Sequence, residues 1–576
     1  MQYPLEEKIG HPDLLVGRTE EFEKFQKWID FIPKKGSKSR VLLARRKSGK
    51  TTFVQRIFNK LWSENGAVIP FYFAFEENKI WFPVFAMNYF QTFASHVISF
   101  LERNEEMVRT LLTFEEIRDY GKSESVNFFV KSVNDILHYQ EMEYNDLMWK
   151  IAYYAPHNFA ASYDKRILVI FDEFQYLAQH VYRDEKLGGK PDESMPGSFH
   201  NVVESKIAPM LVTGSYVGWL LDIAGKYLEA GRLTNIRMSP YLKPEEGLQA
   251  VFKYAEFYEE PLTNETAALI NRLCMSDPFF ISCVIQSNYE NRDLTTEQGV
   301  IETVNYEIAD RKSEMSETWN EYIQLTLSKI NDIHAKNMLL HLSKHNDRIW
   351  TPKQLKDALK LDISVEEIRR KLILMVEADV IEQGVADIDF QGLQDGTLNL
   401  VLRNRFEKEI TGYAPDLKKE FHEQTEELRK DKQRLQGMLN NVSGKMAEYQ
   451  LVVAFLSLKR FSLSAFFSDI SDNTELIIID VRQRFPVQRE DGKNMEIDIV
   501  AESNCGRVVL IEVKKRQEKS GINLVEEFLK KVNIYVRNFP EKTVLTAFLS
   551  LGGFTEEARA FCKSKGIGMA EKIQFM

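Results

Sequence analysis

The chain has 576 residues, a formal net charge of −10 and a hydrophobic fraction of 44%. Its length suits three or four domains, and its acidic balance excludes a surface that binds nucleic acid strongly over its whole extent. The four cysteines show neither zinc-ligand spacing nor a disulfide framework. No apolar run is long enough for a membrane span and no signal peptide opens the chain. We therefore expect a soluble cytoplasmic protein with no membrane partner.

The first motif that carries chemistry is a strand, loop and helix in the run SRVLLARRKSGKTTFVQRIF. Backbone N–H groups at the start of such a helix point toward a bound phosphate. Lys50 is expected to contact the β- and γ-phosphates of ATP, and the Thr51 hydroxyl to hold Mg²⁺. Ala44 stands where the P-loop pattern has its first glycine, so we expect an altered loop or weaker nucleotide binding. The residues expected to hold the nucleotide here are Ser48, Gly49, Lys50, Thr51 and Thr52.

The second motif is acidic, and it follows the continuous apolar run ILVIF. Such a run suits a parallel strand buried on both faces. Asp172 and Glu173 end it, in the arrangement of a Walker B motif. Asp172 is expected to act through Mg²⁺ and Glu173 to polarise the attacking water. The alternative is an acidic turn after a core strand, and the presence of the Gly49–Thr51 loop in the same chain makes that alternative weaker.

The order of apolar runs predicts the fold of this region. AVIPFYFAF, APMLVTGSY and IRMSPYL join the two runs above, and helical segments separate all five. That order predicts a parallel sheet covered by helices. Ser215 follows the fourth run at the polar end of a strand, and Gly17 and Arg18 precede an amphipathic helix near the start of the chain.

Together these phrases resemble the archaeal-type ATPase branch of the STAND class, relatives of AAA+ proteins, over residues 10–290. The resemblance implies that Gly17 and Arg18 lie by the adenine and that Ser215 senses the γ-phosphate. It also implies that Arg232 reaches phosphate or couples the nucleotide to the next domain, although a plain surface arginine is an equal alternative. The sequence departs from the family at Ala44 and at Ser276-Asp277-Pro278.

Residues 331–410 carry a third signature. Three helical runs precede an alternating segment, ADIDFQGLQDGTLNLVLRN, which we interpret as a β-hairpin around Asp395-Gly396. This order looks like a winged helix-turn-helix, a module that follows the ATPase in STAND-like proteins. The third helix carries the cations Arg369, Arg370 and Lys371 among several acidic residues. Contact with DNA and a structural or dimerising role therefore both stay open.

The C-terminal region carries two carboxylates and a lysine on two strand-like runs, EIDIV and RVVLIEV, joined by a polar turn. Strand alternation places Glu512 and Lys514 on one face, and a hairpin would bring Asp498 to them. Two carboxylates can hold a hard divalent cation, and the lysine can orient water or offset phosphate charge. The alternative is a surface hairpin with an incidental Glu–Lys pair.

This pattern looks like the PD-(D/E)xK nuclease core, and the resemblance covers about residues 444–576. It implies a further acidic residue of the metal site on the preceding helix, where Glu448 lies. It also implies Mg²⁺ or Mn²⁺ as the cofactor and DNA as the target. Lys530 and Lys531 on a following amphipathic helix could approach a phosphate, or could be solvated. Lys515, Arg516 and Lys519 add a local basic patch beside Lys514.

The expected architecture is thus an α/β multidomain protein. Its parts are a P-loop ATPase core (10–242), a helical lid (243–330), a winged helix-turn-helix (331–410), a helical linker (411–443) and a restriction-endonuclease-like domain (444–576). Residues 76–165 form a mostly helical insertion that, like the winged helix, could receive a protein partner, and a homo-oligomer is open. Two functions compete: an ATP-regulated nuclease, and a nucleotide-dependent switch or assembly protein whose C-terminal domain binds without cutting.

Overall fold

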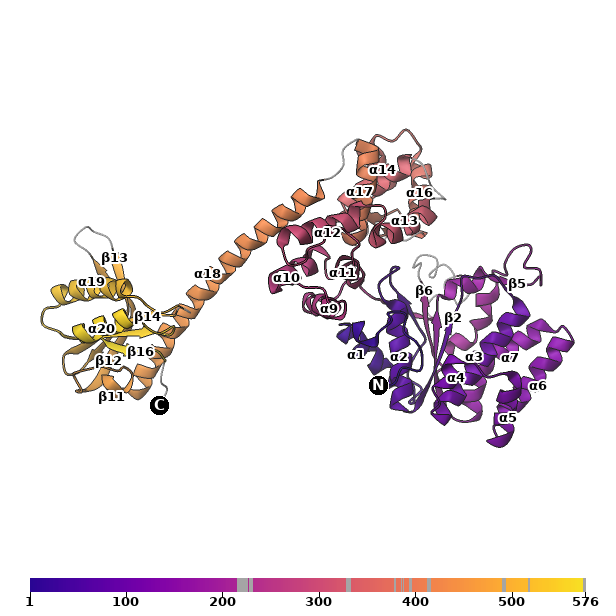
Figure 1. The fold of residues 1–576 in the computed structure, drawn as a ribbon, viewed down its shortest axis with the longest axis horizontal. Coiled ribbons are helices and arrows are strands. Elements are labelled where there is room, and N and C mark those ends of the chain that lie inside the picture. Colours follow the sequence, from indigo (N-terminus) through magenta and orange to yellow (C-terminus); the bar gives the residue numbers. More distant parts are fainter. Residues whose placement is uncertain are drawn as a thin grey trace. The chain divides into compact units, whose positions relative to one another are not determined.

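Two sheets, one toward each end of the chain, organise the structure (Figure 1). The computed structural model describes residues 1–214, 226, 232–327, 333–377, 380–384, 386, 388–392, 396–411, 416–488, 494–515 and 518–572. Three residues named above, Ser215, Asp395 and Arg516, lie outside these ranges. The chain divides into two units, residues 1–422 and 423–576, and each is described by itself.

The first sheet has five strands in the order β2-β4-β6-β1-β7, and every neighbouring pair is parallel. This confirms the predicted parallel sheet. β4, which lies between β2 and β6, is buried along nearly its whole length, as expected of a strand covered on both faces. The fifth strand differs from its prediction, because it begins before IRMSPYL and is largely exposed at the sheet edge. The strands are β1 (Arg40–Leu43), β2 (Val68–Ala74), β4 (Arg166–Asp172), β6 (Met210–Gly214) and β7 (Thr234–Arg237).

Helices cover this sheet, and an aromatic-rich core joins them to it. α2 and α3 both contact β2, and α3 also packs against α7. The insertion after β2 is mostly helical, as the sequence indicated. These elements are η1 (Pro12–Leu14), α1 (Thr19–Ile29), α2 (Lys50–Glu64), α3 (Phe82–Glu102), α4 (Glu106–Arg109), α5 (Phe114–Ser123), α6 (Asn127–Glu141) and α7 (Asn145–Ser162), with the short strands β3 (Ile80–Trp81) and β5 (Val181–Tyr182) and the turns η2 (Phe174–Ala178), η3 (Met195–Phe199) and η4 (Val202–Glu204).

A helical region follows the sheet and shares one apolar core from Leu14 to Phe421. Its last helices surround a three-stranded sheet of order β8-β10-β9. The elements are α9 (Pro244–Phe257), α10 (Asn264–Leu273), α11 (Pro278–Ile285), α12 (Glu297–Ala309), α13 (Glu314–Leu327), α14 (Ile333–Lys344), β8 (Ile349–Trp350), α15 (Pro352–Leu359), α16 (Val365–Glu377), β9 (Ile381–Gln383), β10 (Phe390–Gly392) and α17 (Gly396–Thr411).

The hairpin predicted around Asp395-Gly396 is wrong. β9 and β10 pair as an antiparallel hairpin, so the hairpin lies earlier in the chain. Residues 396–411 form helix α17 instead of a second strand. Val401, Leu402 and Phe406 are buried in the shared core, and Leu402 and Phe406 stand four residues apart, on one face of a helix. That burial outweighs the short alternation in the sequence.

The second unit contains a six-stranded sheet of order β11-β12-β13-β14-β15-β16. β12, β13 and β14 pair antiparallel, whereas β14, β15 and β16 pair parallel. One apolar core joins the sheet to the end of α18 and another joins it to α19 and α20, so helices cover both faces. The elements are α18 (Leu417–Leu458), β11 (Arg460–Ser462), η5 (Leu463–Ala465), β12 (Glu475–Gln488), β13 (Asn494–Ser503), β14 (Arg507–Lys514), α19 (Ile522–Asn538), β15 (Thr543–Ser550), α20 (Glu556–Lys565) and β16 (Gly568–Ala570).

Helix α18 runs without a break across position 443, where a boundary was expected. The linker helix and the first helix of the C-terminal fold are thus one element. Within the ranges given above, no helix combines the length and the apolar character that crossing a membrane requires.

Candidate functional site

The P-loop joins the carboxyl end of β1 to the start of α2. Gly49 is the N-cap of α2, with a left-handed φ of 82°, which glycine adopts without steric cost. Lys47 has a left-handed φ of 62°, whereas Ala44 is not among the residues with positive φ in the described ranges. The glycine-to-alanine departure therefore places no strained backbone in the loop. Lys50 Nζ donates to the carbonyl oxygens of Ala44 at 2.7 Å and Arg45 at 3.1 Å.

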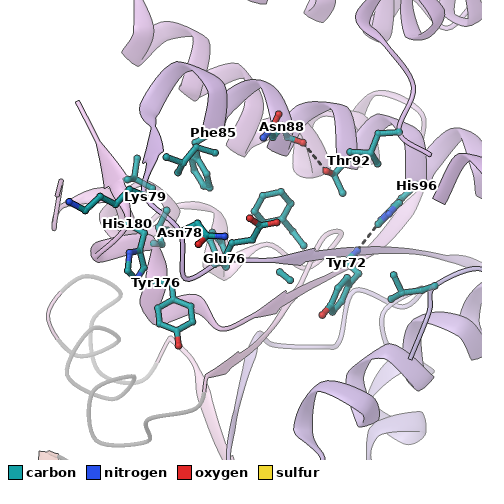
Figure 2. A pocket seen from close by; sticks show the side chains of 18 of the residues that line it. Tyr72, Glu76, Asn78, Lys79, Phe85, Asn88, Thr92, His96, Tyr176 and His180 are labelled. Atoms are coloured by element: carbon teal, nitrogen blue, oxygen red, sulfur yellow. Dashed lines mark hydrogen bonds between the residues drawn. The ribbon is translucent and has the colours of Figure 1, made fainter. Parts of the chain in front are cut away.

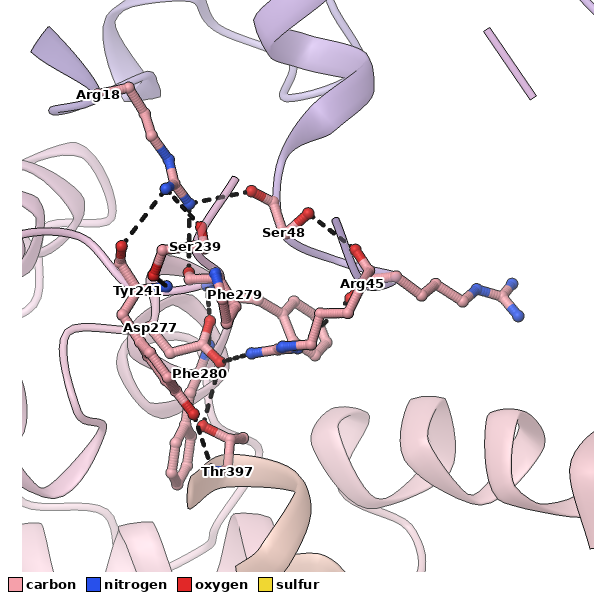
Figure 3. A network of polar contacts seen from close by, with 11 residues as sticks. Arg18, Arg45, Ser48, Ser239, Tyr241, Asp277, Phe279, Phe280 and Thr397 are labelled. Carbon is pink, nitrogen blue, oxygen red and sulfur yellow. Dashed lines mark hydrogen bonds and ion pairs between the residues drawn. The ribbon is translucent and has the colours of Figure 1, made fainter. Parts of the chain in front are cut away.

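Arg18 forms hydrogen bonds both to this loop and to the segment after β7 (Figure 3). Its guanidinium donates to the carbonyl oxygens of Ser48 at 3.2 Å and Ser239 at 2.6 Å, and its side chain is buried. Gly17 before it has a φ of 73°, and an added Cβ would lie 3.0 Å from Glu246 of α9. The Gly-Arg phrase thus holds the P-loop against the first helix of the helical region.

A cavity of about 380 Å³ lies beside the P-loop. Ser48, Gly49 and Thr52 line one side of it, and Arg18 lines it as well. Its other walls come from η1, α9 and α11 and are largely apolar or aromatic. A cavity with backbone amides at one end and apolar walls beyond suits a phosphate-bearing ligand with a flat ring. The apolar and aromatic residues are Ile9, Leu14, Val16, Leu242, Tyr254 and Phe279.

Asp172, the last residue of β4, is held by hydroxyl groups that the sequence did not reveal. Asp172 is fully buried. One carboxylate oxygen accepts a hydrogen bond from Tyr72 Oη of β2 at 3.1 Å, and the other accepts one from Thr213 Oγ1 of β6. Burial and this carboxylate raise the pKa of Tyr72 well above its usual value. Glu173 has a left-handed φ of 56° and accepts a hydrogen bond from Gln175 at 2.5 Å.

A second arginine links the P-loop to the helical region (Figure 3). Arg45 forms an ion pair with Asp277, which is fully buried and caps the N-terminus of α11. Asp277 also accepts a hydrogen bond from Thr397 Oγ1 of α17 at 3.1 Å. The Arg45 guanidinium lies 4.8 Å from the ring centroid of Trp319 in α13. Helices of the region that follows the sheet thus contact the P-loop directly.

Arg232 lies away from these contacts. It donates to the carbonyl oxygen of His200 at 2.8 Å and lies 3.8 Å from Glu204. These contacts belong to the segment between β5 and β6. A role of Arg232 at a phosphate stays a prediction, and the role of Ser215 lies outside the described residues.

Another cavity, of about 500 Å³, lies between β2 and α3 (Figure 2). Its walls mix aromatic side chains with Glu76, Lys79, His96 and His180. Among the described residues, it shares no lining residue with the cavity beside the P-loop. His96 is buried, its Nδ1 accepts the backbone N–H of Tyr72 at 3.3 Å, and burial lowers its pKa to about 3.

In the second unit, Asp498, Glu512 and Lys514 converge as the sequence indicated. Lys514 Nζ donates to Glu512 Oε1 at 2.7 Å. Lys531 of α19 donates to both Glu512 oxygens at 2.8 Å. Asp498 accepts the backbone N–H of Val513 at 2.8 Å. Of the two lysines considered on α19, Lys531 is therefore the one that reaches the carboxylates, while Lys530 is exposed.

The two carboxylates repel each other in a buried setting. Glu512 is 2% exposed. Burial raises the pKa of Asp498 to about 6, the negative charge of Glu512 adds to this, and Lys514 and Lys531 oppose it. Two buried carboxylates of this kind gain from a nearby cation. The arrangement offers oxygen donors, which suit Mg²⁺ or Mn²⁺.

Glu448 lies on α18 and forms an ion pair with Arg484 of β12 at 3.2 Å. The hydrogen bonds and charge of Glu448 raise the pKa of Arg484, and the charge of Asp498 makes a smaller contribution in the same direction. Glu448 thus connects to the carboxylate pair through Arg484, and its place in a metal site stays a prediction. In the parts of the chain with defined positions, no three His, Cys, Asp or Glu side chains cluster as metal ligands.

No protein-family model matches the chain, and no curated protein sequence matches it. Among solved structures it is similar to a Walker-type ATPase of Pyrococcus abyssi, with 14% identity over 69% of this chain and 98% of that chain and a TM-score of 0.46. It is also similar to the ADP form of the ORC2 protein of Aeropyrum pernix, with 13% identity over 69% and 95% and a TM-score of 0.38. The Cdc6p protein of Pyrobaculum aerophilum gives 12% identity over 68% and 96% and a TM-score of 0.26. At these scores the similarity decides nothing about function, which is argued below from the residues of this chain.

Proposed function

We propose that residues 1–422 bind and hydrolyse ATP and that this cycle controls a metal-dependent nuclease in residues 423–576. The observation that supports the nuclease most strongly is the buried cluster of Asp498 and Glu512 with Lys514 and Lys531. The P-loop, the buried Asp172 and the adjoining cavity support the ATPase.

In the ATPase, the amides at the start of α2 and Lys50 would bind the phosphates, and the cavity lined by Tyr254 and Phe279 would take the adenine. Thr51 and Asp172 would hold Mg²⁺, which supplies charge stabilisation at the phosphates when bound. Glu173 would accept a proton from the attacking water. Tyr72 and Thr213 hold the Asp172 carboxylate in place through their hydroxyl groups.

In the nuclease, Asp498 and Glu512 would hold Mg²⁺ or Mn²⁺, which when bound activates water and offsets charge on the scissile phosphate. Mg²⁺ commonly binds through one or two carboxylates plus phosphate oxygens, so a pair of carboxylates fits it. The two lysines are placed to neutralise the phosphate and to orient the water. DNA as the substrate rests on analogy with the nuclease fold alone.

The contacts of Arg45 support a route by which nucleotide would be sensed. Arg45 belongs to the P-loop, and its partners Asp277 and Trp319 belong to the helical region. A phosphate bound at the loop would compete for the guanidinium and weaken those contacts. We infer that ATP binding alters the packing of the helical region against the P-loop.

In this proposal residues 331–410 would form a winged helix, with the β9–β10 hairpin as its wing. The cations of α16 are paired along their own helix, Arg370 with Glu367 at 2.8 Å and Arg369 with Glu366 at 3.9 Å. Those pairs favour a structural role over DNA contact for this helix.

A second candidate function is binding of nucleic acid or partners by residues 423–576 without cutting. It is favoured because Lys514 and Lys531 already neutralise Glu512 and the described residues offer no third acidic ligand.

The test is incubation of the full chain with linear, circular and branched DNA, with Mg²⁺ or Mn²⁺, with and without ATP. We expect metal-dependent cleavage whose rate changes with ATP. DNA binding with no cleavage under any of these conditions would favour the second candidate function.

A further inference from the structure

The C-terminal part of α18 has an apolar stripe that its own unit leaves exposed. On the opposite side of the helix, Ala447, Leu451 and Phe455 are buried in the core against the sheet. That burial fixes the helix, so the exposed stripe cannot turn inward. The exposed apolar residues are Leu435 (61%), Met446 (54%), Tyr449 (57%), Val453 (38%) and Leu456 (46%).

The spacing of these residues is that of a coiled coil. Apolar residues follow one another at alternating steps of four and three along the sequence from Leu435 to Leu456. This is the heptad pattern in which two helices pack knobs into holes. A partner for such a stripe is therefore another helix with the same repeat. The residues are Leu435, Leu439, Val442, Met446, Tyr449, Val453 and Leu456.

The charge pattern favours a second copy of this chain as that partner. The first part of α18, up to Arg434, is densely charged. From Leu435 to Ser457, by contrast, the charged residues are Lys445 and Glu448 alone. Glu448 lies on the buried side. Two identical stripes can thus approach with little like-charge repulsion, whereas an acidic or basic partner would find no matching charges.

The length of the stripe is sufficient for such pairing. It covers 435–456, or about three heptads and roughly 33 Å of helix at about 1.5 Å per residue. Gly437 and Gly444 lie in the same stretch, and each disfavours a helix by about 1 kcal/mol relative to alanine. Packing against a partner helix would offset that cost.

We propose that residues 435–456 of α18 form a self-association surface, on which the same stripe of a second copy packs as a two-helix coiled coil. This pairing needs neither nucleotide nor cleavage activity, so it stands apart from the proposed function. It predicts a dimer of the full chain in nucleotide-free solution.

The test is the molar mass of the full chain by light scattering after size exclusion, over a range of concentrations. The parent, at 67.1 kDa per chain, should approach about twice that mass, as expected for a two-stranded coiled coil. Tyr449→Glu with Val453→Glu should shift the mass to that of one chain. Leu435→Glu, which lies outside the apolar core of the unit, should weaken dimerisation without risk to folding.

A matched control carries the same added charge away from the stripe. Gln433→Glu with Asn473→Glu changes two exposed residues of the same unit and should leave the dimer intact. Circular dichroism of each variant checks that α18 is still formed. A parent of single-chain mass at all concentrations would overturn the proposal. Dimerisation that survives both Leu435→Glu and the double stripe variant with helix content unchanged would also overturn it.

Discussion

Lys50 and Glu173 divide the proposed ATPase chemistry into binding and turnover. Lys50→Ala removes the ammonium group from the phosphates, so ATP hydrolysis should be abolished and nucleotide affinity should fall. Glu173→Gln keeps the size of the side chain but removes the base, so nucleotide should stay bound while turnover stops. Phosphate release and equilibrium binding of a fluorescent ATP analogue measure the two effects. Parental hydrolysis rates in both variants would contradict the ATPase.

Lys531 and Lys530 provide a matched pair at the proposed nuclease site. Lys531 contacts both oxygens of Glu512, whereas Lys530 beside it is exposed. Lys531→Ala should lower the rate of DNA cleavage by about a hundredfold or more, the scale at which loss of one charge-stabilising donor acts. Lys530→Ala should leave it nearly unchanged. Gel assays under single-turnover conditions compare them, and equal losses would remove Lys531 from the site.

His96 makes the first unit sensitive to mild acid. In the folded chain its pKa is about 3, against about 6.5 in the unfolded chain. A lowered pKa of histidine means that the unfolded chain alone takes up the proton between these values. Stability is therefore lost as pH falls through this window, by about 2 kcal/mol between pH 7 and pH 5.

His96→Leu should flatten that dependence, although it also removes the hydrogen bond to the Tyr72 backbone. The measurement is the melting temperature at which residues 1–422 unfold, at pH 7, 6 and 5, in the parent and in the variant. The informative quantity is the slope with pH and not the absolute stability. An equally steep decline in the variant would assign the acid sensitivity to other groups.

At the level of elements, the cap of α11 contributes to folding and takes part in the proposed nucleotide sensing. Asp277 accepts the backbone N–H groups of Phe279 and Phe280 and also pairs with Arg45. Asp277→Ala should lose the cap, worth about 1 kcal/mol, and leave Arg45 without its buried partner, a loss of about 3 to 5 kcal/mol. Asp277→Asn keeps a capping oxygen and removes the charge.

We therefore expect a lower melting temperature for both variants, with the alanine variant lower than the asparagine variant. If Arg45 transmits the nucleotide state, Asp277→Asn should also reduce the ATP-induced change in melting temperature. Identical melting temperatures for parent and both variants would show that the ion pair and the cap contribute nothing measurable.

Some elements could be predicted from the sequence because one physical signal dominated. The run ILVIF is apolar throughout, as is typical of a strand covered on both faces in a parallel sheet. The segment TLNLVLRN was harder, because its alternation fits a strand while Leu398, Val401, Leu402 and Phe406 fit a helix. Tertiary packing decided in favour of α17, and the sequence alone does not contain that contact.

At the scale of the whole molecule, residues distant in sequence could not be placed together beforehand. Arg45 and Asp277 are 232 positions apart, and each reads alone as an ordinary charged residue. Lys531 lies on α19 and Glu512 on β14, and the sequence does not predict how this helix packs on this strand. By contrast, Asp498, Glu512 and Lys514 were predictable, since strand alternation and one hairpin suffice to bring them together.

The central claim is that nucleotide in residues 1–422 controls cleavage by residues 423–576. The most direct measurement is metal-dependent DNA cleavage by the full chain with and without ATP, compared among the parent, Lys50→Ala and Asp498→Asn. We predict that ATP changes the cleavage rate of the parent and that Lys50→Ala cleaves at an ATP-independent rate. Asp498→Asn should not cleave but should hydrolyse ATP as the parent does. Equal cleavage by parent and Asp498→Asn, or an unchanged ATP response in Lys50→Ala, would contradict the account.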